Sequence, residues 1–251
     1  MLVKAGTGHA AASLDLADIF AVLYFEVLKH NPKNPHWPNR DRLCLSCGHA
    51  APILYAALAY SGYFPIAKLN SLRKSGSPMQ GHPSLRDLPG VENSAGSLGQ
   101  GASVAVGRAL SAKMNKQAHF VYCVVSDGEH NEGQLWEAVM LAAKYSLDNL
   151  IFILDRNNIQ IDGFTEDILP LEPLKAKYEA FNWRASEIDG HNIEEIIESI
   201  NQVKKIKGQP KVIIAHTVPG RGVSFMENDW HWHGQAPNEK QGVAALKELK
   251  K

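Results

Sequence analysis

Two polar clusters, each directly after an apolar run, have the residue types that bind a divalent cation. Asp127 follows the apolar run 120–125, and Asn157 follows the run 150–155, thirty positions further along the chain. An aspartate, an asparagine oxygen and nearby backbone carbonyls are hard oxygen donors, which suit Mg²⁺ or Ca²⁺ better than zinc. These protein ligands are too few to enclose an ion, so we expect a phosphate-bearing ligand to complete its coordination. Taken alone, the same residues fit ordinary capping turns equally well.

Four histidines stand beside glycine in loop-like stretches, where a ligand could approach the backbone closely. One such histidine is usually a satisfied polar side chain, but four of them indicate a lined pocket. They are His9, His49, His82 and His233. A histidine-rich metallohydrolase is the least favoured interpretation, because the sequence has no compact set of several histidine ligands.

A glycine-rich stretch at residues 96–101 leads into a helical pattern and could bring backbone N–H groups to a ligand. It lacks the G-x-G-x-x-G spacing after a strand, and the chain has no G-x-x-x-x-G-K-[ST] motif, so nicotinamide-dinucleotide and P-loop functions are disfavoured. Cys44, Cys47 and Cys123 cannot form a disulfide framework. We interpret the first two as thiols flanking a turn, since a structural zinc site would need further ligands.

Composition excludes several broad classes of function. The 251 residues include 26 Lys and Arg and 26 Asp and Glu, so the formal charge is zero and neither a general nucleic-acid binder nor a polybasic membrane surface is indicated. The longest apolar stretch, 19–25, is too short to span a bilayer, and the N-terminus lacks a signal-peptide pattern. A cytoplasmic protein is therefore expected.

Helical and strand patterns alternate along the chain. Strands are expected at 41–45, 120–125, 150–155, 183–188 and 211–216, and helices at 14–28, 50–60, 101–114, 171–181 and 193–203, with one more helix carrying Leu135, Val139, Ala142 and Ala143. Ser13 is expected to cap the first helix, and 80–100 is expected to be a loop. The alternation predicts an α/β fold with a doubly wound, mostly parallel sheet and helices on both faces. Neighbouring parallel strands end at the same edge, so Asp127 and Asn157 should lie close together there.

At this point the sequence resembles a known family. Asp127-Gly128 followed by Asn157 is similar to the thiamine diphosphate motif, and the flanking residues resemble those of transketolase. Matching stretches, in that family's order, are HNPKNP (30–35), RDR (40–42), SCGH (46–49), GHP (81–83), SLGQG (97–101), IDG (161–163) and DGH (189–191). They run over essentially the whole chain and match the family's N-terminal, diphosphate-binding half.

The resemblance implies a set of cofactor contacts. Asp127, Asn157 and the carbonyl of Ile159 would hold the Mg²⁺ (or Ca²⁺) that bridges the two phosphates of thiamine diphosphate. Gly128 would let the backbone approach the diphosphate. The remaining cofactor contacts would come from His49, His233, Gly96 and Leu98, with the last two on the aminopyrimidine side and His231 as an alternative to His233.

The resemblance also implies catalytic residues. His9 and His82 match histidines that face the donor's hydroxyls and help to move protons, together with His233, and Glu132 matches an acid that communicates with a partner glutamate. Two positions depart from the family pattern. Ser126 replaces the first glycine of the motif, and Gly8-His9 is followed by Ala10 instead of proline, which relaxes that loop.

The resemblance implies an incomplete active site. Residues 1–251 correspond to one diphosphate- and metal-binding domain, while the family's pyrimidine-binding and C-terminal domains are expected on a separate chain. We therefore expect the N-terminal subunit of a split transketolase, which transfers a two-carbon ketol unit from a ketose to an aldose in a heterotetramer with two copies of each chain. Two alternatives stay open, a subunit of a thiamine diphosphate enzyme acting on 2-oxo acids and a non-catalytic cofactor-binding subunit.

Overall fold

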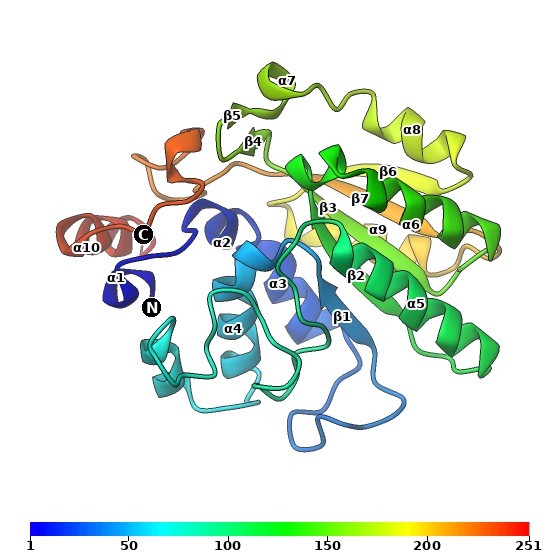
Figure 1. Ribbon diagram of the computed structural model, residues 1–251, viewed down its shortest axis with the longest axis horizontal. Helices are drawn as coiled ribbons and strands as arrows, with labels where there is room; N and C mark the ends of the chain where they lie inside the picture. Colours follow the sequence, from blue (N-terminus) through cyan, green and yellow to red (C-terminus); the bar gives the residue numbers. More distant parts are fainter. Residues whose placement is uncertain (251) are drawn as a thin grey trace.

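Five strands form one fully parallel sheet in the computed structural model, which describes residues 1–250 (Figure 1). Its strand order is β1-β2-β3-β7-β6. The strands are β1 (Arg42–Leu45), β2 (Val121–Ser126), β3 (Leu150–Arg156), β6 (Arg184–Asp189) and β7 (Lys211–His216). All five predicted strands are confirmed, each with bounds within one residue of the prediction.

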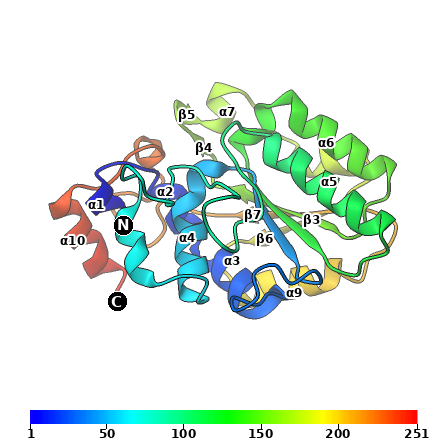
Figure 2. The ribbon, with the colours of Figure 1, turned by 60° about the horizontal axis from the view of Figure 1, so that its bottom comes forward.

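Helices cover both faces of this sheet, so the doubly wound α/β prediction is confirmed. Figure 2 shows α5 and α6 on one side of the strands and α3 and α9 on the other. The helices are α1 (Leu2–Ala5), α2 (Ala11–Asp15), α3 (Ala17–Val22), α4 (Ala51–Tyr60), α5 (Gln100–Met114), α6 (Gly133–Lys144), α7 (Thr165–Ile168), α8 (Leu174–Ala180), α9 (Ile193–Val203) and α10 (Glu239–Glu248). Shorter turns are η1 (Leu23–Val27), η2 (Gly48–Ala50), η3 (Ile66–Ser71), η4 (Gly128–Asn131) and η5 (Trp230–Trp232).

The alternation of side chains along each strand produces two separate cores. Tyr122 and Ile151 join the core beneath α3, α4 and α9, whereas Cys123 and Phe152 join the core beneath α5, α6 and α8. Successive side chains of a strand point to opposite faces, and a parallel sheet with both faces covered therefore needs continuous apolar runs. This is why β2 and β3 are buried along their whole length.

The first predicted helix differs from the observed structure. Residues 11–27 form α2, α3 and the π-helical turn η1, with a break at Leu16. Ser13 lies inside α2, where its hydroxyl donates to the carbonyl of His9 at 3.0 Å, so the prediction that it caps a helix is wrong. Sequence periodicity predicted the buried stripe correctly but gave no sign of the break at Leu16.

Several elements were absent from the prediction, including the short helices α1 and α7. A short hairpin, β4 (Ile159–Gln160) and β5 (Gly163–Phe164), follows β3 directly. The C-terminal helix α10 begins with a capping box, in which the side chains of Asn238 and Gln241 each accept from the backbone N–H of the other. None of the helices between residues 1 and 250 combines the length and apolar character needed to cross a membrane.

Candidate functional site

The two predicted polar clusters meet at the carboxyl edge of the sheet. Ser126 at the end of β2 is in register with Asp155 near the end of β3, and the N–H of Asp127 donates to the carbonyl of Asp155 at 3.1 Å. The N–H of Asn158 in turn donates to the Asp127 carboxylate at 2.6 Å. The parallel pairing of β2 and β3 thus closes the thirty-residue separation, and the prediction that the clusters lie together is confirmed.

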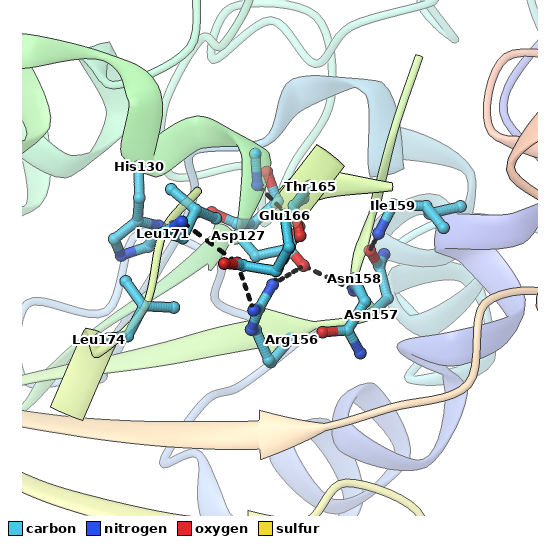
Figure 3. A network of polar contacts seen from close by, with 12 residues as sticks. Asp127, His130, Arg156, Asn157, Asn158, Ile159, Thr165, Glu166, Leu171 and Leu174 are labelled. Atoms are coloured by element: carbon cyan, nitrogen blue, oxygen red, sulfur yellow. Dashed lines mark hydrogen bonds and ion pairs between the residues drawn. The ribbon is translucent and has the colours of Figure 1, made fainter. Parts of the chain in front are cut away.

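Asp127 is fully buried, and three donors hold its carboxylate (Figure 3). Oδ1 accepts from the N–H of Gly128 at 2.7 Å, while Oδ2 accepts from Asn158 and from Nη1 of Arg156 at 3.1 Å. Burial raises the pKa of Asp127 to about 6, and the guanidinium of Arg156 acts in the opposite direction. Arg156 was not among the predicted site residues.

The side-chain amide of Asn157 is fixed by two buried acids that the sequence prediction missed. Its Nδ2 donates to Oδ2 of Asp15 at 3.0 Å and to Oδ2 of Asp155 at 3.1 Å. The amide oxygen points away from both acids and accepts from the N–H of Ile159 at 3.1 Å. Burial raises the pKa of both acids. Asp155 stands at the end of the apolar run 150–155, whereas Asp15 stands between two leucines, Leu14 and Leu16, and carries no comparable signal.

A cavity of about 280 Å³ opens beside these residues and collects most of the predicted site. The predicted residues that line it are His9, His49, His82, Gly96, Leu98, Gly128, Asn157, Ile159 and His233, and Ser126, Glu129, Gln160 and Ile161 complete the lining. A larger cavity of about 630 Å³ lies among α1, α2, α4 and α10, but its lining is mainly apolar and includes none of the predicted site residues.

Three of the four histidines form a cluster of rings. The ring centroids of His9 and His49 lie 5.1 Å apart, those of His49 and His233 5.1 Å, and those of His9 and His233 5.8 Å. Burial, followed by the neighbouring charges, lowers the pKa of His9 to about 4. Burial also lowers the pKa of His49, of His233 and of His82. All four imidazoles are therefore neutral at pH 7.

The structure separates the two candidate histidines near the C-terminus. His233 lines the cavity. His231 is on the surface, where Nδ1 contacts a carboxylate oxygen of Asp229 at 2.6 Å and the ring stacks on Trp230. Glu132 is exposed at the start of α6 and does not line the cavity. Its contact with a partner glutamate stays a prediction.

Glu129 is a buried site residue that sequence reasoning missed. Its Oε1 accepts from the N–H of Gly99 at 2.5 Å and from the hydroxyl of Ser46, and its Oε2 accepts from the N–H of Ser126 at 3.2 Å. Burial raises its pKa. These bonds fix the glycine-rich stretch against the end of β2. A Cβ on Gly101 would lie 2.4 Å from the Cα of Ser46, so this close approach requires glycine.

Comparison with known proteins assigns the family. Residues 1–250 match the family model described as "Transketolase, thiamine diphosphate binding domain". The chain belongs to the transketolase family. The resemblance seen in the motifs of the sequence is thereby confirmed, and it extends over the described part of the chain.

The curated relatives of this transketolase-family chain include separate subunits and full-length enzymes. It is 46% identical over 248 residues to the 6-deoxy-6-sulfo-D-fructose transketolase subunit SqwG of Clostridium sp. (strain MSTE9), covering 99% of this chain and 90% of the relative. It is 42% identical to an apulose-4-phosphate transketolase subunit of Actinobacillus succinogenes, covering 97% and 88%. Human transketolase is 39% identical over 250 residues, which are 98% of this chain but 39% of the human protein.

Solved transketolase structures share the fold closely. The Campylobacter jejuni enzyme superposes with a TM-score of 0.93 at 40% sequence identity, covering 98% of this chain and 40% of that chain. The Leishmania mexicana enzyme gives a TM-score of 0.93 at 33% identity, covering 99% and 39%. The chain therefore spans about two fifths of these solved transketolases.

The oxygen donors at the sheet edge fit a divalent cation. Within residues 1–250 no group of three or more His, Cys, Asp or Glu is placed to hold a metal. The predicted donor set is instead one carboxylate, one amide oxygen and one carbonyl, and it stays a prediction. In the described chain, Oδ1 of Asp127 and Oδ1 of Asn157 each accept one protein hydrogen bond. Each oxygen therefore keeps acceptor capacity for an ion.

The cavity also fits an organic cofactor. Nδ1 of His9, Nδ1 of His233 and Nε2 of Gln160 are buried and have no hydrogen-bond partner among the residues that the structure describes. Buried polar atoms normally have partners, so these nitrogens indicate a polar ligand. A Cβ on Gly96 would meet no atom within 4 Å, which shows that the lining leaves open space there.

Proposed function

We propose that this chain is the N-terminal subunit of a transketolase that transfers a two-carbon ketol unit from a ketose to an aldose, with thiamine diphosphate and Mg²⁺ (or Ca²⁺). The observation that carries the proposal is the cavity at the sheet edge, where the four histidines and Asn157 line one space in a chain of this family. Residues 1–251 act as the diphosphate- and metal-binding domain of the enzyme.

The acidic edge of the cavity binds the cation and the diphosphate. Asp127, Asn157 and the carbonyl of Ile159 hold the ion, and the backbone of Gly128 approaches the phosphates. A Cβ at Gly128 would lie 3.3 Å from the Cβ of Gln160, so glycine keeps this approach open. Bound thiamine diphosphate supplies the electron sink that cleavage of a ketose beside its carbonyl requires.

The histidines contact the ring system and the sugar. His49 and His233 contact the cofactor, while His9 and His82 face the hydroxyls of the donor sugar. A neutral imidazole can accept a proton from a hydroxyl and return it, and burial keeps these side chains neutral at pH 7. Gly96 and Leu98 line the aminopyrimidine side.

A separate C-terminal subunit completes the site, in a heterotetramer with two copies of each chain. Two similar relatives are named as subunits, and this chain spans about two fifths of full-length transketolases. Large apolar side chains on α5, on α6 and at the C-cap of α6 are exposed and would be covered by such a partner. They are Val104, Met140, Leu141 and Tyr145. Glu132, at the start of α6, would face the partner's glutamate. The whole complex is proposed to be cytoplasmic.

Reconstitution tests this function. The chain is purified, mixed with its candidate C-terminal subunit, Mg²⁺ and thiamine diphosphate, and assayed with phosphorylated, sulfonated and unsubstituted ketoses and with 2-oxo acids. We expect ketol transfer from a ketose in the mixture and none from either chain by itself. Full activity of this chain alone would refute the split site. Turnover of 2-oxo acids only, or cofactor binding with no turnover, would favour one of the two alternative functions.

A further inference from the structure

We propose that Arg156 is a positioning residue that holds the cation ligand Asp127 and the segment 159–174 in one fixed arrangement before any cation binds. The proposal rests on the cofactor site described above and adds a residue to which no role has been assigned. It concerns the last residue of β3, whose side chain is 3% exposed and lies between the sheet edge and the segment that follows (Figure 3).

The guanidinium of Arg156 uses all five of its N–H donors. Nη1 donates to Asp127 at 3.1 Å and to the hydroxyl of Thr165 at 2.8 Å. Nη2 donates to Glu166 at 2.8 Å and to Glu172 at 3.0 Å, and Nε donates to Glu172 at 3.2 Å. A planar guanidinium has five donors in a fixed fork, so this set of partners also fixes the orientation of the fork.

The two glutamates extend the arrangement into the backbone of the segment. Glu166 also accepts from the N–H of Leu171 at 3.1 Å, and Glu172 accepts from the N–H of Leu174 at 2.7 Å. The buried guanidinium of Arg156 is therefore linked, directly or through the two glutamates, to the segment 159–174 at several points. The start of the same segment, Ile159 to Ile161, lines the cavity. Displacement of the segment would move that lining.

Two effects of Arg156 on cation binding oppose each other. Its positive charge, 3.1 Å from Asp127, repels a divalent cation bound to the same carboxylate. Its hydrogen bonds hold that carboxylate and the backbone carrying Ile159 in place, which removes the cost of ordering them when the ion binds. Glu166 and Glu172 share the charge of the guanidinium, and this weakens the repulsion. The geometry therefore favours positioning as the larger effect.

Substitutions of Arg156 in the assembled complex separate the two effects. Thiamine diphosphate binding is titrated with Mg²⁺ by calorimetry. If positioning dominates, Arg156→Gln raises the Mg²⁺ concentration for half-maximal binding by about 10- to 100-fold, the usual cost of removing an outer partner of a metal ligand. Arg156→Lys keeps the charge but has only three donors, so its Mg²⁺ concentration for half-maximal binding should lie between those of the wild type and Arg156→Gln. Cation binding by Arg156→Gln that equals or exceeds the wild type would overturn the proposal.

A second measurement needs neither the cofactor nor the partner. In the chain alone, the double variant Glu166→Gln/Glu172→Gln loosens the segment through two half-exposed side chains, 42% and 50% exposed, and should not endanger folding. Hydrogen exchange at the amides of Thr165, Leu171 and Leu174 should then accelerate at least several-fold. Unchanged protection of these amides would show that Arg156 does not hold the segment and would overturn the proposal.

Arg40→Gln is the matched control. Arg40 also forms a double hydrogen bond to a buried glutamate, Glu92, but at the opposite, amino edge of the sheet. This variant should lose stability without changing Mg²⁺ affinity or exchange in the segment 159–174. If the wild-type complex does not bind thiamine diphosphate, the proposed function fails, whereas the exchange measurement on the chain alone still decides the role of Arg156.

Discussion

Two groups of residues at the carboxyl edge of the sheet are held in different ways. Of the first group only Asn157 lines the cavity, whereas all four histidines of the second group line it. The acid floor, which we define as Asp15, Asp127, Asp155 and Asn157, is tied by side-chain hydrogen bonds to one another and to the backbone. The histidine wall, His9, His49, His82 and His233, has no side-chain hydrogen bond within residues 1–250. The three clustered rings of the wall contact one another, with centroids 5.1 to 5.8 Å apart.

This difference indicates two tasks. A cation and a diphosphate need oxygens and N–H groups fixed in advance, because ordering charged ligands at the moment of binding would cost affinity. Proton transfer to a sugar needs nitrogens that are not already engaged. We therefore expect the floor to act in both stability and cofactor binding, and the wall to act in catalysis while contributing less to stability. Substitutions on each side test this contrast.

The largest effect is expected from Asp127→Ala on the floor. The substitution removes the proposed cation ligand and leaves the N–H groups of Gly128 and Asn158 without their acceptor, so unfolding free energy should fall by about 2–4 kcal/mol. Thiamine diphosphate affinity, measured by calorimetry in the assembled complex, should fall by roughly 100-fold or more. The exposed Asp167→Ala on α7 is the control and should change stability by less than about 0.5 kcal/mol. Wild-type cofactor affinity in Asp127→Ala would contradict the assignment of the floor.

His82→Asn on the wall should separate catalysis from stability. Turnover should fall by roughly 100- to 10,000-fold, the usual contribution of a proton-transfer group, while the unfolding free energy changes by less than about 0.5 kcal/mol. Steady-state kinetics and urea unfolding of the same preparation measure the two quantities. His231→Asn, at the exposed histidine outside the cavity, should leave both unchanged. A loss of stability comparable to that of Asp127→Ala would remove the contrast between wall and floor.

Glu129→Gln asks whether the floor extends beneath the glycine-rich stretch. The backbone N–H groups of Gly99 and Ser126 donate to the two carboxylate oxygens of Glu129. A glutamine has one oxygen and can accept from only one of these N–H groups, because its NH₂ group would face the other. We expect a loss of about 1–3 kcal/mol in urea unfolding and weaker cofactor binding. Ser46→Ala removes one donor to the same carboxylate and should cost less, about 1 kcal/mol. Equal unfolding free energies of wild type and Glu129→Gln would show that Glu129, like the residues of the wall, contributes little to stability.

The smallest effect is a change in the pH dependence of stability. The pKa of His9 is lowered to about 4 in the folded chain and is about 6.5 in an unfolded one. Unfolding therefore takes up a proton between these values, so the contribution of neutral His9 is complete above pH 6.5 and is lost as the pH falls toward 4. The pH dependence of the unfolding free energy, measured by urea unfolding between pH 4 and 6.5, gives the number of protons taken up on unfolding. His9→Asn should take up about one proton fewer than the wild type. At pH 8 the slopes of wild type and variant should coincide; unequal slopes there, or equal slopes at pH 5, would contradict the lowered pKa.

Much of the fold follows from local patterns. The central strands β2, β3 and β7 were predicted within one residue because their apolar runs are almost continuous and end on polar residues. The hairpin β4–β5 was missed because its strands are two residues long, too short for a periodic signal. Helix α10 was missed because its residues are mostly polar, although its capping box is present in the sequence.

The sequence by itself determined which residues end the strands and, through parallel pairing, that Asp127 and Asn157 share one edge of the sheet. It also placed four histidines in loops that could reach that edge. Tertiary structure alone decided that Asp15 holds the amide of Asn157 across 142 positions and that His233, not His231, enters the cavity. The physical reason is that strand ends follow from local apolar patterns, whereas the burial and hydrogen bonding of these side chains depend on packing between segments distant in the sequence.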